Sequence, residues 1–406
     1  MALGTVLACS LAQQSAMGQQ GSGTAPEQTE RVKVLLGIDV LAVNGFAPLA
    51  GLRVGLLANA ASRNSTGRHT VDVLANAPGV RLTALFSPEH GLKADREGKV
   101  ESGRDAGTGL PVHSLYGASR RPSAAMLAGL DAVVVDIQDV GVRFYTYATT
   151  MAYLMEEAAK RRVKVMVLDR PNPIGAAGVR GPTLDTALRS FVGYFEMPVQ
   201  HAMTLGELAT MFNAERQIGA DLTVITMRNY RRSSWYDETG LAWVNPSPNL
   251  RSLDATILYP GVALIEQTNV SVGRGTATPF ELVGAPWIDG PALAKHLERR
   301  GIAGVQFKPV HFTPASDRYA GKRCQGVRIV LSNRSALDAD RLGIELAVAL
   351  HRLYPGTFVV RDMLALLGSR SVLAAIEANE DPAVIESRWQ PAVRAFDAMR
   401  AKYLLY

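Results

Sequence analysis

The sequence predicts an α/β protein whose first part is built on a parallel sheet. Two apolar runs rich in β-branched residues, at 82–86 and 132–137, have the length of strands that are buried on both faces. Segments with the apolar spacing of helices follow such runs, and this alternation is typical of a parallel α/β sheet. A polar cluster comes directly after each of the two runs, where a sheet of this kind binds its ligand.

The N-terminal half begins with structured segments at 31–41 and 53–59. Ser65 or Thr66 is expected to cap a helix that runs through His69. Further strands are predicted at 82–86, 132–137, 163–168 and 222–227, and further helices near 122–129 and 149–162.

Between these elements, residues 175–198 and 229–256 are rich in Gly, Pro or aromatic side chains and are predicted to be irregular. Thr204 is expected to begin a helix, because Glu207 stands at the spacing of a capping box.

A domain boundary is expected near Asp254. The predicted organisation is a signal-like or lipoprotein-like segment with a flexible linker at 1–29, a first α/β domain at 30–254 and a second, smaller α/β domain at 255–406. In the last domain we expect strands near 305–312 and 326–331, and helices near 337–352, 361–378 and 388–403.

Composition excludes several classes of protein. The chain has 406 residues, a net charge of +6 and a pI near 9.3, but its Lys and Arg residues are scattered, so no nucleic-acid partner is expected. There is no run of about 18 apolar residues, so no membrane-spanning segment is expected. With Cys9 and Cys324 as the only cysteines, we expect neither a disulfide framework nor a cysteine-based metal site.

The first residues are small and apolar, and they are similar to a clipped secretory signal. The segment Val6-Leu7-Ala8-Cys9 also resembles a bacterial lipobox, which would place a lipid anchor on Cys9. We therefore expect a periplasmic or secreted protein, and a disordered cytoplasmic tail is the alternative.

The two polar clusters contain carboxylates suited to acid and base chemistry. Glu89 and His90 follow the first apolar run, while Asp136 and Asp139 end the second. Parallel strands bring these side chains to one edge of the sheet, where a pair of carboxylates can act on a bond between them. The alternatives are a surface carboxylate in a capped loop for Glu89 and a structural ion pair with Arg143 for Asp136.

A third cluster lies in the C-terminal part. Gly273 and Gly275 flank Arg274, which allows backbone amides and a guanidinium to approach an anion, although a simple glycine turn is the alternative. The loop matches neither a Walker motif nor a dinucleotide fingerprint. The aromatic residues Trp235, Tyr236 and Trp243 belong either to the core or to a surface that stacks on sugar rings.

With these residues in view, the chain resembles the NamZ family of exo-β-N-acetylmuramidases. The matching stretches extend from about residue 52 to residue 290 and read GLLANAAS, LFSPEHGL, DIQDVGVRFYTY, LDRPNP, NPSPNLRSLDATILYPG and EQTNVSVGRGTATPFELVGAPW. The resemblance implies a Rossmann-like first domain, a smaller α/β domain and an active-site cleft between them. It also implies that the protein releases N-acetylmuramic acid from the non-reducing end of peptidoglycan fragments, with Glu89 as the catalytic acid.

We accordingly expect catalytic roles for Glu89, His90 and Asp139. Side chains expected to bind the muramyl sugar are Asp136, Arg143, Tyr145, Tyr147, Asn172, Asn249, Glu266, Asn269 and Arg274. Because muramic acid carries a lactyl carboxylate, Arg143 and Arg274 are the expected cations for it.

We expect no nucleotide and no required metal, because the glycine fingerprint is absent and the histidines lack zinc-binding spacing. Two alternatives are a metal-dependent hydrolase with Glu89, His90, Asp136 and Asp139 as ligands, and a non-catalytic periplasmic protein that binds cell-wall sugars.

Overall fold

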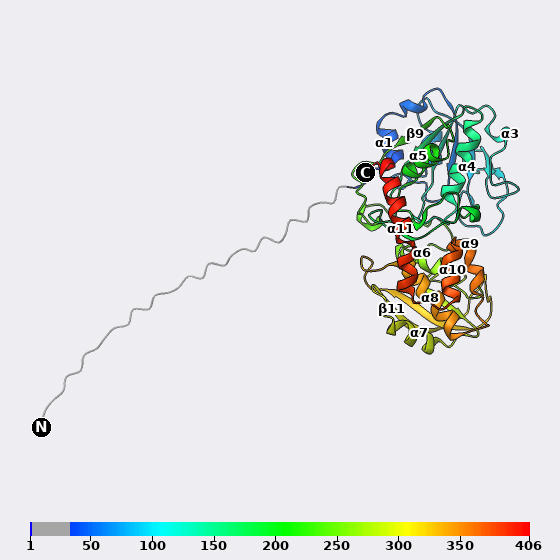
Figure 1. Ribbon diagram of the computed structural model, residues 1–406. Helices are drawn as coiled ribbons and strands as arrows, with labels where there is room; N and C mark the ends of the chain where they lie inside the picture. Colours follow the sequence, from blue (N-terminus) through cyan, green and yellow to red (C-terminus); the bar gives the residue numbers. More distant parts are fainter. Residues whose placement is uncertain (2–32) are drawn as a thin grey trace. The chain divides into compact units, whose positions relative to one another are not determined.

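The computed structural model of the protein describes Met1 and residues 33–406 (Figure 1). The predicted signal-like segment and the lipid anchor at Cys9 lie outside the described residues, and both stay predictions. Within 33–406 the chain forms two lobes, one around a large sheet and the other around a small sheet.

The first lobe contains a seven-stranded sheet with the order β3-β4-β2-β1-β5-β6-β9. Its strands are β1 (Arg53–Ala58), β2 (Arg81–Ser87), β3 (Gly103–Arg104), β4 (Pro111–Ser114), β5 (Ala132–Asp136), β6 (Lys164–Leu168) and β9 (Leu222–Ile225). All neighbours pair in parallel except β3 and β4. Without β3, the order of the strands along the chain is that of a Rossmann sheet, and the order reverses between β1 and β5.

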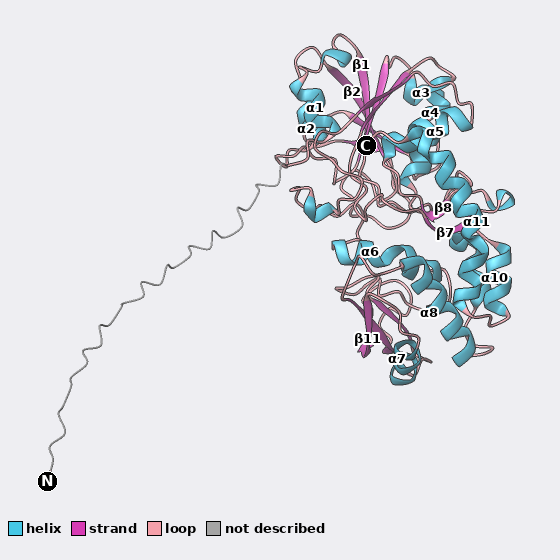
Figure 2. Cartoon of the chain, turned by 60° about the vertical axis from the view of Figure 1, so that its left-hand side comes forward, coloured by secondary structure: helices cyan, strands magenta, loops and turns pink. Residues whose placement is uncertain are grey.

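Helices cover both faces of this sheet (Figure 2). They are α1 (Gly37–Val43), α2 (Thr70–Ala75), α3 (Ala124–Leu127), α4 (Tyr147–Ala159) and α5 (Leu205–Glu215). On β5, Val134 packs with the apolar side chains of α1 and α2, whereas Val133 and Val135 pack with those of α4 and α5. The strand is therefore buried on both faces, which is why its sequence is continuously apolar and does not alternate.

The second lobe has a three-stranded antiparallel sheet in the order β10-β12-β11. Its elements are α6 (Leu253–Val262), β10 (Leu282–Ala285), α7 (Gly290–Arg299), β11 (Val305–Phe312), β12 (Cys324–Leu331), α8 (Ala339–Leu353), α9 (Leu364–Leu367), α10 (Arg370–Glu377) and α11 (Pro382–Arg400). A further ribbon of β7 (Arg180–Thr183) and β8 (Pro198–Gln200) belongs to the segment that the sequence predicts to be irregular.

The last helix, α11, runs back to the first lobe, where the chain ends (Figure 1). Arg400 donates from Nη1 to the carbonyl of Ala202 at 2.7 Å, and the Tyr406 hydroxyl donates to Asp169 Oδ2 at 2.8 Å. Burial raises the pKa of Asp169 to about 6. Residues far apart in the sequence thus tie the second lobe to the carboxyl end of β6.

Two local predictions were wrong for identifiable reasons. The N-cap of α2 is His69, whose Nδ1 accepts from the amide of Val71, so the helix starts later than a cap at Ser65 or Thr66 would place it. The single helix predicted at 361–378 is broken at Gly368, which has a φ of 68° and separates α9 from α10.

In the described part of the chain, no helix combines the length and the apolar character that crossing a lipid bilayer requires.

A buried ion pair joins the carboxyl ends of the two central strands β5 and β6. Arg170 donates from Nη2 to Asp136 Oδ2 at 2.8 Å, and the Thr70 hydroxyl donates to the same oxygen. Both charged side chains are almost fully buried, at 4% and 1% exposed. Asp136 is therefore a structural residue. Its ion-pair partner is Arg170, so the alternative of a pair with Arg143 is wrong.

The isosteric substitution Asp136→Asn should lower the free energy of unfolding by about 3–5 kcal/mol, because it leaves the guanidinium of Arg170 buried without its counter-charge. Denaturant titration measures the change. The matched control is Asp131→Asn, which breaks the solvent-exposed pair with Arg53 and should have a much smaller effect. Equal losses in the two variants would contradict this account.

Another buried carboxylate, Asp340, lies in the first turn of α8 against the other lobe. Gln200 donates to its Oδ2 at 2.6 Å, while Oδ1 has no hydrogen-bond partner among the described residues. Burial raises the pKa of Asp340 to about 8. The protonated carboxyl is thus the form that this contact between the lobes favours.

Because the folded-state pKa of Asp340 is raised, its stabilising contribution is complete at acidic pH and is lost as the pH rises through about 8. Asp340→Asn is neutral at every pH, so it should melt above the wild type at about pH 9, by roughly 2 °C or more. At about pH 4 the difference should nearly vanish. Calorimetric scans of both proteins at the two pH values test this, and a gap that does not depend on pH would refute it.

Candidate active site

A cavity of about 220 Å³ opens between the two lobes, next to the carboxyl end of β2. Its polar and charged lining includes Glu89, His90, Glu97, Arg120, Thr146, Ser247, Asn249, Glu266, Gln267 and Arg274. Its aromatic lining includes Tyr116, Phe144, Tyr145, Phe191, Tyr259 and Phe280. Six of the predicted site residues line this cavity: Glu89, His90, Tyr145, Asn249, Glu266 and Arg274.

Glu89 is held in this cavity by the turn that ends β2. Pro88 stops the strand, and both His90 and Gly91 have left-handed backbones, with φ values of 69° and 79°. The hydroxyl of Thr146, at the start of α4, donates to Glu89 Oε2 at 2.6 Å. One carboxylate oxygen is therefore fixed by a residue that follows β5, two strands away from β2 along the same edge of the sheet.

His90 is oriented by the loop that follows. Its Nδ1 lies 2.7 Å from the carbonyl oxygen of Arg96, so Nδ1 carries the proton and donates it. In the neutral ring, Nε2 is then the nitrogen that can accept a hydrogen bond. The half-buried side chain of His90 can serve as a polar neighbour of Glu89.

Aromatic rings form much of the wall. Tyr145 packs between Tyr147 and Tyr259, with ring centroids 4.6 Å and 6.1 Å away. Burial and the nearby charge of Glu89 raise the pKa of Tyr116 to about 12, so its hydroxyl stays protonated at ordinary pH. Rings of this kind are well suited to the apolar faces of sugars.

Arg274 lines the cavity, but its guanidinium is already surrounded by carboxylates. It pairs with Glu97 at 2.7 Å, with Asp317 at 2.6 Å and with Glu266. These charges raise the pKa of Arg274 further above its ordinary value, while burial raises that of Glu266. Arg274 thus lines the cavity, but three acidic groups already pair with its guanidinium, and its predicted contact with a sugar carboxylate stays a prediction.

Asp139 is not part of the cavity wall. Its Oδ2 accepts from the amide of Gly141 at 2.7 Å and lies 3.4 Å from Nε2 of the fully buried His201. Its other oxygen, Oδ1, has no hydrogen-bond partner among the described residues. The side chain is 7% exposed and stabilises a tight turn, so its placement does not support the predicted catalytic contact with substrate.

Arg143 is also structural. The side chain is 1% exposed, and its guanidinium donates at 2.8–3.1 Å to four backbone carbonyls, of Pro182, Met197, Leu366 and Leu367. Two of these carbonyls end α9, a favourable position for a cation. The prediction that Arg143 binds the sugar is therefore wrong: it joins the two lobes from inside.

Three other predicted sugar ligands are used internally. Tyr147 is fully buried and donates to the carbonyl of Pro246 at 2.7 Å. Asn172 is 3% exposed and donates to the carbonyl of Met203. Asn269 donates to the carbonyl of Thr357 and accepts from the amide of Val359. None of the three lines the cavity.

The ligand set of the metal-dependent alternative is not assembled. Asp136 is paired with Arg170, and Asp139 lies outside the cavity that holds Glu89 and His90. Across residues 33–406, no three His, Cys, Asp or Glu side chains converge in a way that would hold an ion.

Sequence reasoning missed several wall residues, above all Tyr116, Arg120, Thr146 and Phe191. Thr146 stands inside the polar cluster after the second apolar run, so its position was a usable signal. The other three come from loops whose approach to Glu89 depends on the packing of the whole lobe.

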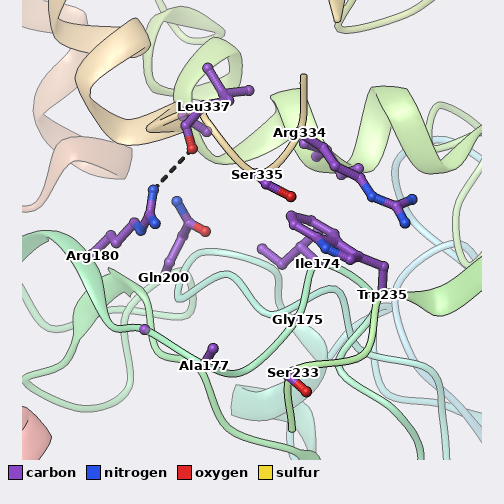
Figure 3. A pocket seen from close by; sticks show the side chains of 13 residues that line it. Ile174, Gly175, Ala177, Arg180, Gln200, Ser233, Trp235, Arg334, Ser335 and Leu337 are labelled. Carbon is purple, nitrogen blue, oxygen red and sulfur yellow. Dashed lines mark hydrogen bonds between the residues drawn. The ribbon is translucent and has the colours of Figure 1, made fainter. Parts of the chain in front are cut away.

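A second cavity, also of about 220 Å³, lies elsewhere between the lobes and contains Trp235 (Figure 3). Arg180 donates to the carbonyl of Leu337 at 2.9 Å, and Arg334 stacks over Trp235 while it pairs with Asp237. Its lining includes no Asp, Glu or His, so it offers no acid or base. The predicted catalytic residues Glu89 and His90 line the other cavity.

A carboxyl group held by a hydroxyl, with other carboxylates and aromatic rings around one small cavity, defines the class of protein as a glycoside hydrolase on a two-lobed α/β fold. The family models agree. The N-terminal model of the exo-β-N-acetylmuramidase NamZ matches residues 54–254, and the C-terminal model matches residues 257–406. The protein belongs to the NamZ family of exo-β-N-acetylmuramidases.

Individual relatives cover nearly the whole chain. The peptidoglycan β-N-acetylmuramidase NamZ of Bacillus subtilis strain 168 is 40% identical over 385 residues, which are 94% of this chain and 93% of that protein. A crystal structure of a DUF1343 family protein from Bacteroides fragilis has a TM-score of 0.86 at 32% identity and covers 93% of this chain and 100% of its own. A second such protein from the same organism has a TM-score of 0.75 at 34% identity, with 92% and 99% covered.

Thr146→Val should lower kcat by roughly tenfold or more, because the carboxyl group of Glu89 loses the hydrogen bond that orients it. Hydrolysis of a chromogenic muramic acid glycoside measures the loss. Thr150→Val is the matched control: Thr150 lies one turn further along α4 and donates to the carbonyl of Thr146, away from the cavity. An unchanged kcat in Thr146→Val would show that this hydrogen bond to Glu89 does not matter for turnover.

Proposed function

We propose that this protein is an exo-acting glycoside hydrolase that releases N-acetylmuramic acid from the non-reducing end of peptidoglycan fragments. The observation that carries the proposal is the placement of Glu89, which is half-buried, fixed through Oε2 by Thr146 and lines a cavity between the lobes. The 40% identity to the Bacillus subtilis peptidoglycan β-N-acetylmuramidase supports the choice of substrate.

In this mechanism Glu89 is the acid that protonates the leaving glycosidic oxygen. Its Oε2 accepts from Thr146, which leaves Oε1 to carry the proton to the substrate. Glycoside hydrolases use a pair of carboxyl groups. We assign Glu266 as the partner of Glu89 in this pair, since it lines the same cavity and is anchored by Arg274. Glu97 also lines the cavity, but its side chain is 50% exposed and therefore less fixed.

The size of the cavity suits removal of one terminal sugar. At about 220 Å³ it is smaller than the roughly 300–1,000 Å³ typical of pockets for drug-sized ligands. Side chains of both lobes contribute to it, among them Phe144 of the first and Phe280 and Leu366 of the second. A short, walled cavity accepts a chain end more readily than the middle of a long glycan.

The test is the release of nitrophenol from para-nitrophenyl N-acetylmuramic acid. Wild-type protein should cleave this compound, whereas Glu89→Gln should lose activity by about 100-fold or more and keep the melting temperature. Glu266→Gln should also lose most of its activity. If wild-type protein binds the sugar in a calorimeter and yet releases no product, the non-catalytic binding protein becomes the better description.

We also propose that the protein acts outside the cytoplasm, on the strength of the small, apolar N-terminal segment with Cys9. Fractionation of cells that produce the full chain tests this, and protein found only in the cytoplasmic fraction would contradict it.

A further inference from the structure

A cation without an acidic partner stands at the cavity wall. Arg120 belongs to the turn between β4 and α3, is exposed, and lines the cavity together with Glu89. No carboxylate of a residue within 33–406 lies in ion-pairing range of its guanidinium, which contrasts with Arg274 and its three acidic neighbours.

Aromatic rings hold this guanidinium in place. Its central carbon lies 4.3 Å from the ring centroid of Phe191 and 5.4 Å from that of Tyr116. Stacking of this kind uses the flat face of the guanidinium and leaves the N–H groups at its edge free to donate. The side chain is therefore held at the cavity with no acidic partner among the described residues that an anion would have to displace.

Arg120 is also close to the acid. Tyr116 lies beside it, and the charge of Glu89 acts on the Tyr116 hydroxyl. A sugar whose glycosidic oxygen lies at Glu89 would thus have the guanidinium of Arg120 nearby, on the wall of the same cavity. The group that distinguishes N-acetylmuramic acid from N-acetylglucosamine is a lactyl ether with a carboxylate, and a planar guanidinium can bind a carboxylate with two parallel hydrogen bonds.

We propose that Arg120 binds the lactyl carboxylate of the terminal muramic acid and so determines which sugar the cavity accepts. The proposal rests on the function proposed above, and it replaces Arg143 and Arg274 in this role. Arg120 is a specificity residue: it contacts the substrate away from the bond that breaks.

Four proteins test it: wild type, Arg120→Gln, Arg120→Lys and the control Arg121→Gln. The control is matched because Arg121 is the next residue and also stacks on an aromatic ring: its central guanidinium carbon lies 3.7 Å from the ring centroid of Tyr153. Unlike Arg120, it pairs with a carboxylate, that of Glu156, and does not line the cavity. The substrates are para-nitrophenyl N-acetylmuramic acid and its lactyl amide, which has nearly the same shape and no charge.

Arg120→Gln should lower kcat/KM for the acid by about 10- to 100-fold, mainly through KM, and should leave the amide nearly unchanged. Arg120→Lys should recover part of the loss, and Arg121→Gln should behave as wild type. If Arg120→Gln still prefers the acid over the amide as strongly as wild type does, Arg120 is not the residue that binds the lactyl group.

Calorimetry separates this inference from the proposed function. N-acetylmuramic acid should bind wild-type protein more tightly than N-acetylglucosamine does, and Arg120→Gln should remove the difference. Absence of turnover with that pattern of binding would reject the hydrolase and keep the role of Arg120. Turnover of the acid by wild type, with no change in Arg120→Gln, would keep the hydrolase and reject the role of Arg120.

Discussion

The buried pair of Asp136 and Arg170 is the interaction on which the geometry of the site depends. Two strands at the centre of the sheet end in charged side chains that solvent does not reach, so each charge needs the other. Every residue from Ala132 to Ala152 is buried, including the irregular segment after β5 that leads to Thr146. Because a buried loop must satisfy its own polar groups, this segment is held rigidly, and Thr146 reaches Glu89 in one orientation.

The same constraint explains why several polar residues near the site are structural. Gln138 donates to the carbonyl of Pro171, Asp139 accepts from the amide of Gly141, and Arg143 is surrounded by carbonyls of both lobes. These side chains replace the water that an exposed loop would use. Catalysis therefore depends on them indirectly, since they position the few side chains that do face the cavity.

The two arginines that line the cavity, Arg274 and Arg120, differ in their acidic neighbours. Glu97, Glu266 and Asp317 surround Arg274 and connect the loop after β2 with the second lobe, whereas Arg120 stacks on aromatic rings and has no acidic partner among the described residues. A guanidinium with acidic partners maintains the shape of a site, and one without them is available to a ligand. The distinction depends on neighbours and not on residue type, which is why Arg274 and Arg120 serve different purposes.

The sequence by itself determined the parallel α/β class, the buried central strands, the capping box at Thr204 and the polar turn that carries Glu89, because each follows from a local pattern of burial or backbone geometry. Only the tertiary structure decided which polar residues face the cavity. Asp139 and Arg143 follow the second apolar run as closely as Thr146 does, yet only Thr146 points to Glu89. The reason is physical: a side chain at a sheet edge is functional or structural according to the partners that distant segments bring to it, and spacing along the chain carries no record of those partners.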